Sequence, residues 1–278
     1  MTAVGPIRTL IGPGPVDPRL PEPNSLRRAS EAAKAAVAVA VEALGGRTVT
    51  EQTGLYVGQQ QVPLDYCQQF IDASYRNGPR FASPMLFSES VANNAATHLS
   101  LTLGFRGAIQ TFIGSRTAGV AALRAAEEDV RTGAVDSGLV VLLSFATPLT
   151  VQAYAAIYRT KAPFPLENGA AAFRVEREAF PGSRLIRRLA LGCRGRTREL
   201  QVRALRELDG SGPKTASVFC LARERSLGAL REAMTGIQPR EPAGESFALD
   251  PFLALAADGP RTVVVLGEEG TAGLVSLA

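Results

Sequence analysis

The chain of 278 residues is 46% hydrophobic and 20% charged, so it can bury a full core and is not a wholly disordered polypeptide. No apolar run approaches the roughly 18 residues that a membrane-spanning helix needs. Residues Met1 to Pro15 lack a basic region followed by a signal-type apolar core, so we expect a cytoplasmic protein. Cys67, Cys193 and Cys220 are too scattered for a disulfide framework or a zinc site, and we expect no metal and no cofactor.

The net charge of +4 comes almost entirely from arginine, and the densest basic stretch lies between residues 184 and 198. That stretch has no aromatic residue on which a base could stack, so it predicts a solvated face or a docking patch for an acidic partner rather than nucleic-acid binding. His98 is the only histidine, which limits acid–base chemistry at neutral pH. We interpret His98 as an ordinary helix residue.

The first half of the chain alternates apolar runs with helical patterns. Residues 3–11 predict a strand, and a helix capped by Ser25 follows a proline-rich loop and continues to Gly45 and Gly46. The pattern then predicts, in order, a strand, two helices, a strand, a helix and two strands, over residues 53–57, 63–76, 90–103, 108–113, 117–133, 139–145 and 167–176. This alternation is typical of an α/β fold with a mixed, largely buried sheet.

After Pro181 the pattern repeats in a reduced form. It predicts strands at 184–192, 216–222, 261–266 and 273–277, helices near 226–234 and at 250–257, and a loop at 238–246. We interpret residues 1–278 as a single domain, with an N-terminal half over 1–180 and a shortened C-terminal half over 181–278.

The elbow between the strand 108–113 and the following helix is the main candidate site. Gly104 and Gly107 punctuate a turn before the strand, and the elbow itself spans Gly114 to Gly119. A strand that turns sharply into a helix presents a side chain at the helix N-terminus, where free N–H groups and the dipole favour an anion. Nucleophilic thiolates are placed at such N-termini for that reason.

This elbow resembles that of the β-ketoacyl synthases of the thiolase-like superfamily, where a Gly-x-x-Gly turn and a strand lead to Thr-Ala-Cys-x-Ser-Gly-(x)4-Ala. With the pattern aligned on Gly119, the family's nucleophilic cysteine falls on Arg116, one residue after Ser115. Weaker similarities follow the family's order along the chain, at residues 54–58, 83–94, 169–176 and 267–273. The resemblance implies a thiolase-like layered αβαβα fold with a shortened C-terminal half.

The departures from the family pattern imply a catalytically inactive member. Catalytic ketosynthases need the cysteine and two histidines, whereas this chain has Arg116 and a single His98 upstream of the elbow. In this it resembles the chain-length factors of type II polyketide synthases, and its short second half is similar to those that serve reduced polyene chains. The resemblance implies a heterodimer with a catalytic ketosynthase, an acyl chain carried by acyl carrier protein, a shared acyl tunnel, and no activity of the chain alone.

The sequence leaves three other interpretations. A priming decarboxylase keeps the two histidines that this chain lacks, and a serine hydrolase at Ser115 would need a Gly-x-Ser-x-Gly elbow and a further histidine. The third is a structural homodimer or scaffold. Such a protein, or a hydrolase, should be soluble alone, whereas a chain-length factor should need its ketosynthase.

Two sets of residues follow from the resemblance as site candidates. A cation at a helix N-terminus is opposed by the dipole, so we expect Arg116 to be held by Glu268 and Glu269 in the C-terminal loop, as a plug of the inactive site. The alternative is that Arg116 faces the partner and the two glutamates face water.

The second set concerns the partner. We expect the strand 108–113 and the helix 63–76 to form the interface with the ketosynthase. The candidate tunnel and interface residues are Gln61, Tyr66, Phe70 and Phe112. The alternative is that the three aromatic residues belong only to the core.

Overall fold

The computed structural model describes residues 2–11, 26–60, 63–114, 116–158, 168–193, 198–209, 217–219, 232–233, 238–240, 247–256, 262–266 and 271–278. The strands are β1 (Ala3–Val4), β2 (Arg8–Ile11), β3 (Thr53–Gln60), β4 (Ile109–Ile113), β5 (Ser137–Ser144), β6 (Gly169–Glu176), β7 (Arg184–Cys193), β8 (Ser217–Phe219), β9 (Gln238–Arg240), β10 (Thr262–Leu266) and β11 (Thr271–Leu277). The helices are α1 (Glu31–Leu44), α2 (Leu64–Asn77), η2 (Pro79–Phe81), α3 (Pro84–Ser90), α4 (Asn94–Leu103), α5 (Ala118–Thr132), α6 (Pro148–Tyr158), α7 (Arg198–Asp209), η3 (Phe247–Leu249) and α9 (Asp250–Ala256).

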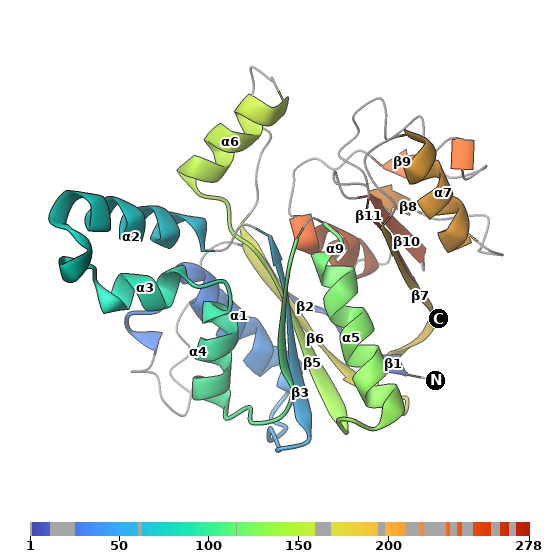
Figure 1. The fold of residues 1–278 in the computed structure, drawn as a ribbon. Helices are drawn as coiled ribbons and strands as arrows, with labels where there is room; N and C mark the ends of the chain where they lie inside the picture. Colours follow the sequence, from blue (N-terminus) through green and yellow to red (C-terminus); the bar gives the residue numbers. More distant parts are fainter. Residues whose placement is uncertain are drawn as a thin grey trace.

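The N-terminal half builds a mixed sheet around β3 and β5 (Figure 1). β3 is parallel to β4 on one side and to β5 on the other, and β6 adds to β5 in the antiparallel sense. β4 is therefore the end strand of this sheet in the described part of the chain. The carboxyl ends of β3, β4 and β5 all meet at one edge, which is where sites form in sheets of this kind.

The C-terminal half adds strands in the order β7, β11, β10, β8 and β9, and β1 joins the two halves by pairing with both β6 and β7. Helix α5 lies between the halves and contacts β3 and β5 on one side and β7 and β11 on the other. Helices α1 and α4 cover the outer face of the first sheet, and α7 packs on the second. The predicted succession of helix, sheet, helix, sheet and helix is confirmed.

Burial on both faces explains the apolar run that predicted β5. Every residue of β5 after Ser137 is buried, because α1 covers one face of the strand and α5 covers the other. Small residues allow α1 to pack closely on the sheet. The buried side of α1 consists of alanines and valines, and it packs on Ala170 and Ala172 of β6.

Several boundaries differ from the predictions. The predicted strand 3–11 is split into β1 and β2 by the residues around Pro6, which has no N–H to donate to a ladder. The prediction of Ser25 as the cap of the first helix is wrong, because Ser30 occupies the N-cap and its Oγ accepts the N–H of Ala33 at 3.2 Å. Ser25 itself lies outside the described residues.

The predicted helix 90–103 corresponds to α4, and the short helix α3 before it was not predicted. Ser83 caps α3, Pro84 stands at its first position, and the chain turns again before α4 begins at Asn94. Helices α6 and α7 were not predicted, and β9 lies where a loop was expected. Of the predicted helix 226–234, only residues 232–233 are described.

Candidate functional site

The elbow forms as predicted, at the carboxyl end of β4. The chain leaves β4 at Ile113, and α5 begins at Ala118. Arg116 is only 3% exposed, so a guanidinium is buried at the N-terminal end of α5. Ser115 lies outside the described residues.

The elbow is in contact with the start of β11. The Thr117 hydroxyl donates a hydrogen bond to the Thr271 hydroxyl, with the oxygens 3.1 Å apart. Thr271 follows the loop 267–270, and the predicted plug residues Glu268 and Glu269 belong to this loop, outside the described residues. Thr271, the first described residue after that loop, therefore contacts the residue that directly follows Arg116 in the chain.

Glycines let the start of α5 approach its neighbours closely. A Cβ placed on Gly119 would lie 2.6 Å from the carbonyl oxygen of Ala248 and 2.8 Å from the ring of Phe252. A Cβ on Gly58 of β3 would lie 2.9 Å from the carbonyl oxygen of Ala118. The elbow is thus held tightly between β3 on one side and η3 and α9 on the other.

Gly119→Ala should destabilise the chain by about 1–3 kcal/mol, although alanine is the better helix former, because the added methyl group meets a backbone carbonyl that cannot move alone. Gly114→Ala is the matched control at the other end of the elbow. No atom lies within 4 Å of its Cβ position and its φ is outside the left-handed region, so we expect a change within about 0.5 kcal/mol. The chain has no tryptophan, so urea unfolding followed by far-ultraviolet circular dichroism compares the variants. Equal stability of the two would contradict the tight packing of the elbow.

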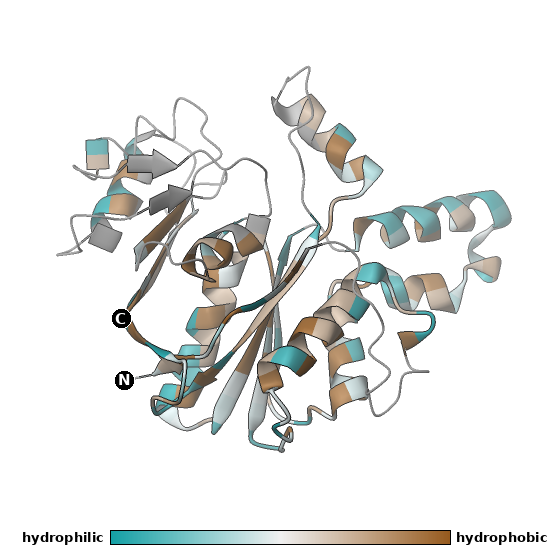
Figure 2. Ribbon diagram, turned by 180° about the vertical axis from the view of Figure 1, so that it is seen from behind, coloured by the Kyte–Doolittle hydropathy of each residue, from teal (hydrophilic) through white to brown (hydrophobic). Residues whose placement is uncertain are grey.

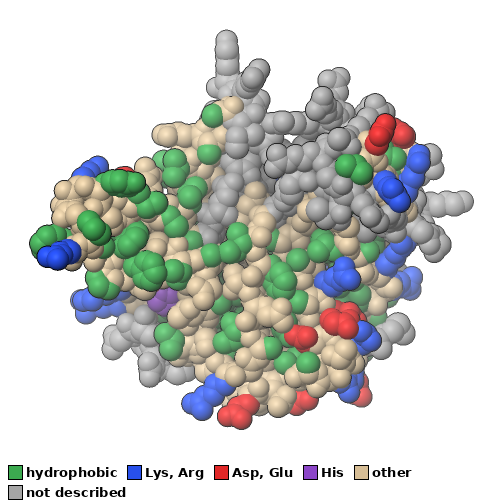
Figure 3. Space-filling view, in the orientation of Figure 1, with side chains coloured by type: hydrophobic (Ala, Val, Ile, Leu, Met, Phe, Trp, Pro, Cys, Tyr) green, Lys and Arg blue, Asp and Glu red, His purple; other side chains and the backbone are tan. Residues whose placement is uncertain are grey.

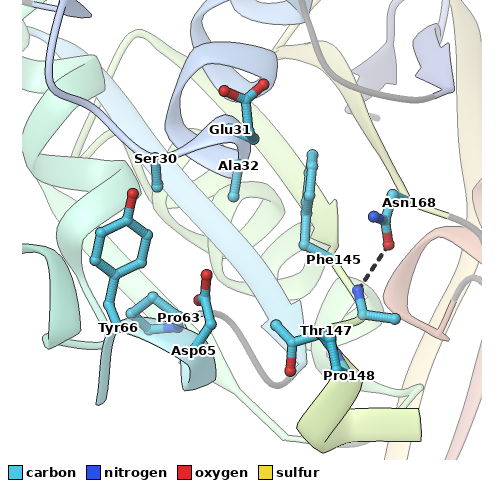
Figure 4. A pocket seen from close by; sticks show the side chains of 11 residues that line it. Ser30, Glu31, Ala32, Pro63, Asp65, Tyr66, Phe145, Thr147, Pro148 and Asn168 are labelled. Carbon is cyan, nitrogen blue, oxygen red and sulfur yellow. Dashed lines mark hydrogen bonds between the residues drawn. The ribbon is translucent and has the colours of Figure 1, made fainter. Parts of the chain in front are cut away.

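A pocket of about 230 Å³ opens at the same edge of the sheet, at the carboxyl ends of β3 and β5 (Figure 4). Its walls come from the starts of α1, α2 and α6, and Tyr66 of α2 points into it. The side-chain oxygen of Asn168 accepts the N–H of Ala146 at 2.7 Å and holds the loop after β5 in place. Burial, followed by the charges of Asp65, Glu89 and Glu31, raises the pKa of Tyr66, so its phenol stays protonated.

The described residues among the predicted tunnel residues have different surroundings in this chain. Tyr66 lines the pocket beside α1, whereas Phe112 pairs with Gly58 in register and packs against the core on the α5 side of the sheet. Phe70 is half-buried against Phe87 of α3, with ring centroids 5.5 Å apart. Gln61 lies outside the described residues.

Phe87 was not predicted as a partner of Phe70. The two residues are 17 positions apart, on different helices, and no periodicity within one helix links them. Phe87 is 55% exposed, so the aromatic pair reaches the molecular surface.

Exposed hydrophobic side chains gather on one part of the molecule. In the described part of the chain, the large hydrophobic residues that are exposed are Ile71, Tyr75, Phe81, Met85, Phe87, Leu101, Ile109 and Ile113. All of them belong to the segment from α2 to β4, and Figure 3 shows hydrophobic side chains over the region of α2 and α3. Because contiguous exposed apolar patches mark interaction sites, the region of α2 and α3 is a candidate for one.

Two other kinds of feature are absent from the described residues. They contain no group of three or more histidine, cysteine, aspartate or glutamate side chains that could hold a metal ion. None of the helices resolved in that part of the chain is both long enough and apolar enough to cross a membrane.

The comparison with protein families identifies the N-terminal half. Residues 16–180, more than half of the chain, match the family described as beta-ketoacyl synthase, N-terminal domain. No curated protein matches the chain in sequence.

Solved structures share the fold at low sequence identity. The ishigamide ketosynthase/chain length factor has a TM-score of 0.75 and 19% identity, over 93% of this chain and 83% of that chain. A chain from the complex of a type II polyketide synthase acyl-carrier protein with its ketosynthase bound to the hexaketide has a TM-score of 0.78 and 15% identity. The match covers 100% of this chain and 99% of that chain, so the two are about equally long. A β-ketoacyl synthase from Burkholderia phymatum STM815 has a TM-score of 0.67 and 14% identity, over 95% of this chain and 86% of that chain. The family match and the shared thiolase-like fold show that this chain belongs to the β-ketoacyl synthase family.

Proposed function

We propose that this chain is a non-catalytic chain-length factor. In this role it pairs with a catalytic ketosynthase and shapes the tunnel for a polyketide, polyene or fatty-acyl chain carried by acyl carrier protein. The observation that carries the proposal is the burial of Arg116 at the start of α5, where the family pattern has its nucleophilic cysteine. A guanidinium stays protonated at physiological pH and cannot attack a thioester.

The likeness to a ketosynthase/chain length factor and to a chain of about equal length from a polyketide synthase complex supports the same role. The absence of nucleic-acid and membrane partners is part of the proposal. The chain is proposed to act in the cytoplasm as one domain.

The segment from α2 to β4 is the proposed interface. β4 is the end strand of its sheet, and its two terminal residues, Ile109 and Ile113, are 43% and 58% exposed. An exposed strand edge with apolar ends favours pairing with a strand of another chain. Helices α2 and α3 of the same segment carry further exposed apolar side chains. We assign the surface to the ketosynthase partner.

The proposal also includes the charge-paired plug of Arg116, Glu268 and Glu269. Its support is the contact between Thr117, which directly follows the buried Arg116, and Thr271, the first described residue after the loop with both glutamates. A buried guanidinium at the positive end of a helix needs a carboxylate for charge compensation.

The test uses the purified chain, a full-length ketosynthase encoded beside it, and both together. Radiolabelled malonyl-carrier protein should release no carbon dioxide above background with the isolated chain, and the co-expressed pair should migrate as a heterodimer that releases it. Turnover by the isolated chain that disappears in Ser115→Ala would instead favour an enzyme. A stable homodimer that binds no ketosynthase would favour a scaffold.

Phe70→Ala in the heterodimer should shift the product distribution toward longer acyl chains. The truncation removes a half-buried ring that packs on Phe87 at the proposed interface, and the tunnel beside it gains room. Mass spectrometry of the released acyl chains measures the shift. Arg124→Ala is the control, since Arg124 is exposed on α5, outside the segment from α2 to β4, and should leave the distribution unchanged. Unchanged products together with lost stability would assign Phe70 to the core.

A further inference from the structure

A buried carboxylate lies where three helices meet, outside the elbow and the pocket. Glu89 is the penultimate residue of α3 and is 6% exposed. Its Oε2 accepts the backbone N–H of Ser30 at 3.2 Å and the amide of Asn94 at 3.1 Å. Its Oε1 lies 2.8 Å from Nε2 of His98 on α4. Glu89 thus contacts the N-cap of α1, the first residue of α4 and a later turn of α4.

The surroundings of Glu89 suit an ionised carboxylate. Ser30 is the N-cap of α1, so the carboxylate stands at the positive end of that helix. An ionised carboxylate only accepts hydrogen bonds, so Nε2 of His98 carries the donated proton. Removal of one partner of such a buried group is costly because the charge left behind is desolvated.

Helix α2 depends on this junction for its place. None of the residues of α2 is fully buried, so the helix has no anchor in the core. It packs on α3 through Phe70 and Phe87, and the Cys67 thiol donates to the carbonyl oxygen of Ser90 at 2.9 Å. Ser90 directly follows Glu89. The hydrogen bond from Cys67 of α2 and the hydrogen bonds of Glu89 therefore involve adjacent residues of α3.

The turn between α3 and α4 is also tied to the sheet. The side-chain amide of Gln59 on β3 donates to the carbonyl oxygen of Ala92. The junction around Glu89 therefore links α3 to α1, to α4 and, through the turn, to β3. Figure 1 shows α2 and α3 extending outward from the sheet at this place.

We propose that the Glu89–His98 pair is a positioning device that fixes α2 and α3 as one rigid unit, and so presents their exposed apolar side chains to the partner. The part of this proposal that concerns a partner rests on the proposed function. The part that concerns the placement of α2 and α3 rests only on the contacts above. His98 acts here through Glu89 and has no direct role in chemistry.

Amide hydrogen exchange of the full-length chain tests the placement. His98→Leu removes the donor to Glu89, and exchange in α2 and α3 should become about tenfold faster or more, as expected for the loss of a hydrogen bond to a charged group. Exchange in α5 and β5 should not change. His98→Gln, whose amide reaches a similar position, should restore most of the protection. Thr97→Leu, at an exposed position of the same helix, is the control and should resemble the unmodified chain.

The ketosynthase encoded beside the chain provides the second readout. Its affinity should fall about tenfold with His98→Leu and recover with His98→Gln. Uniformly faster exchange over the whole chain, unchanged exchange in α2 and α3, or no rescue by glutamine would overturn the proposal. If the unmodified chain binds no ketosynthase, the proposed heterodimer fails, and the exchange pattern alone decides the positioning role.

Discussion

Ile113→Asp should prevent the chain from pairing with its ketosynthase while the chain itself stays folded. Ile113 ends β4 and is 58% exposed, so an aspartate there is solvated in the isolated chain. In a heterodimer joined along β4, the carboxylate would be buried without a partner. A buried, unpaired charge costs roughly 3–5 kcal/mol, which corresponds to a loss of affinity of about a hundredfold or more.

Isothermal titration or co-purification with the ketosynthase measures this loss. The control is Ala134→Asp, in the exposed loop between α5 and β5, which adds the same charge away from the proposed interface. Circular dichroism should show both variants folded. If Ile113→Asp binds as tightly as Ala134→Asp, the partner does not pair along β4.

The elements that the sequence predicted well are those whose local pattern and tertiary environment agree. The continuous apolar run from Leu139 to Phe145 predicted a strand. The run has no polar alternation because β5 is buried on both faces. Gly133 alone predicted the end of α5, because glycine readily adopts the left-handed conformation that ends many helices. In the structure Gly133 has a φ of 81°. Helix α3, which starts with Ser83 as its cap and Pro84 at its first position, was missed because its seven residues are too few to show a helical period.

The candidate site was only partly predictable, because its contacts join distant parts of the chain. The position of Arg116 followed from the resemblance, but its burial did not, and the adjacent Thr117 contacts Thr271, which lies 154 residues later in the chain. Phe112 and Tyr66 both looked suited to a tunnel. The sheet register separates them, since the pairing of Phe112 with Gly58 turns its ring toward α5, whereas Tyr66 lines the pocket beside α1.

His98 was interpreted as an ordinary helix residue, and its position on α4 agrees with that interpretation. Its contact with Glu89 was not predictable from spacing, because Glu89 lies on a different helix and the turn between the two helices sets their relation. A single histidine in one sequence does not indicate which carboxylate it will contact. The buried carboxylate became visible only once α1, α3 and α4 were placed together.

The second large effect is expected at the inactive site. Arg116→Ala should destabilise the chain by roughly 3–5 kcal/mol, because the proposed plug would be left with buried carboxylates and no cation. The dipole of α5 alone would predict the opposite sign, a gain of roughly 0.3–1 kcal/mol on removal of a cation from the helix N-terminus. The sign of the change therefore distinguishes a paired arginine from one that only opposes the helix dipole.

Urea unfolding of Arg116→Ala, of Glu268→Ala with Glu269→Ala, and of the triple variant completes the test. Charges that compensate one another should show coupling, so the triple variant should recover part of the stability that Arg116→Ala loses. Arg124→Ala, at an exposed position of the same helix, is the control and should change stability by no more than about 0.5 kcal/mol. Additive losses in the three variants would show that Arg116 and the two glutamates do not interact. In that case the buried guanidinium of Arg116 would have to be compensated by groups other than these glutamates.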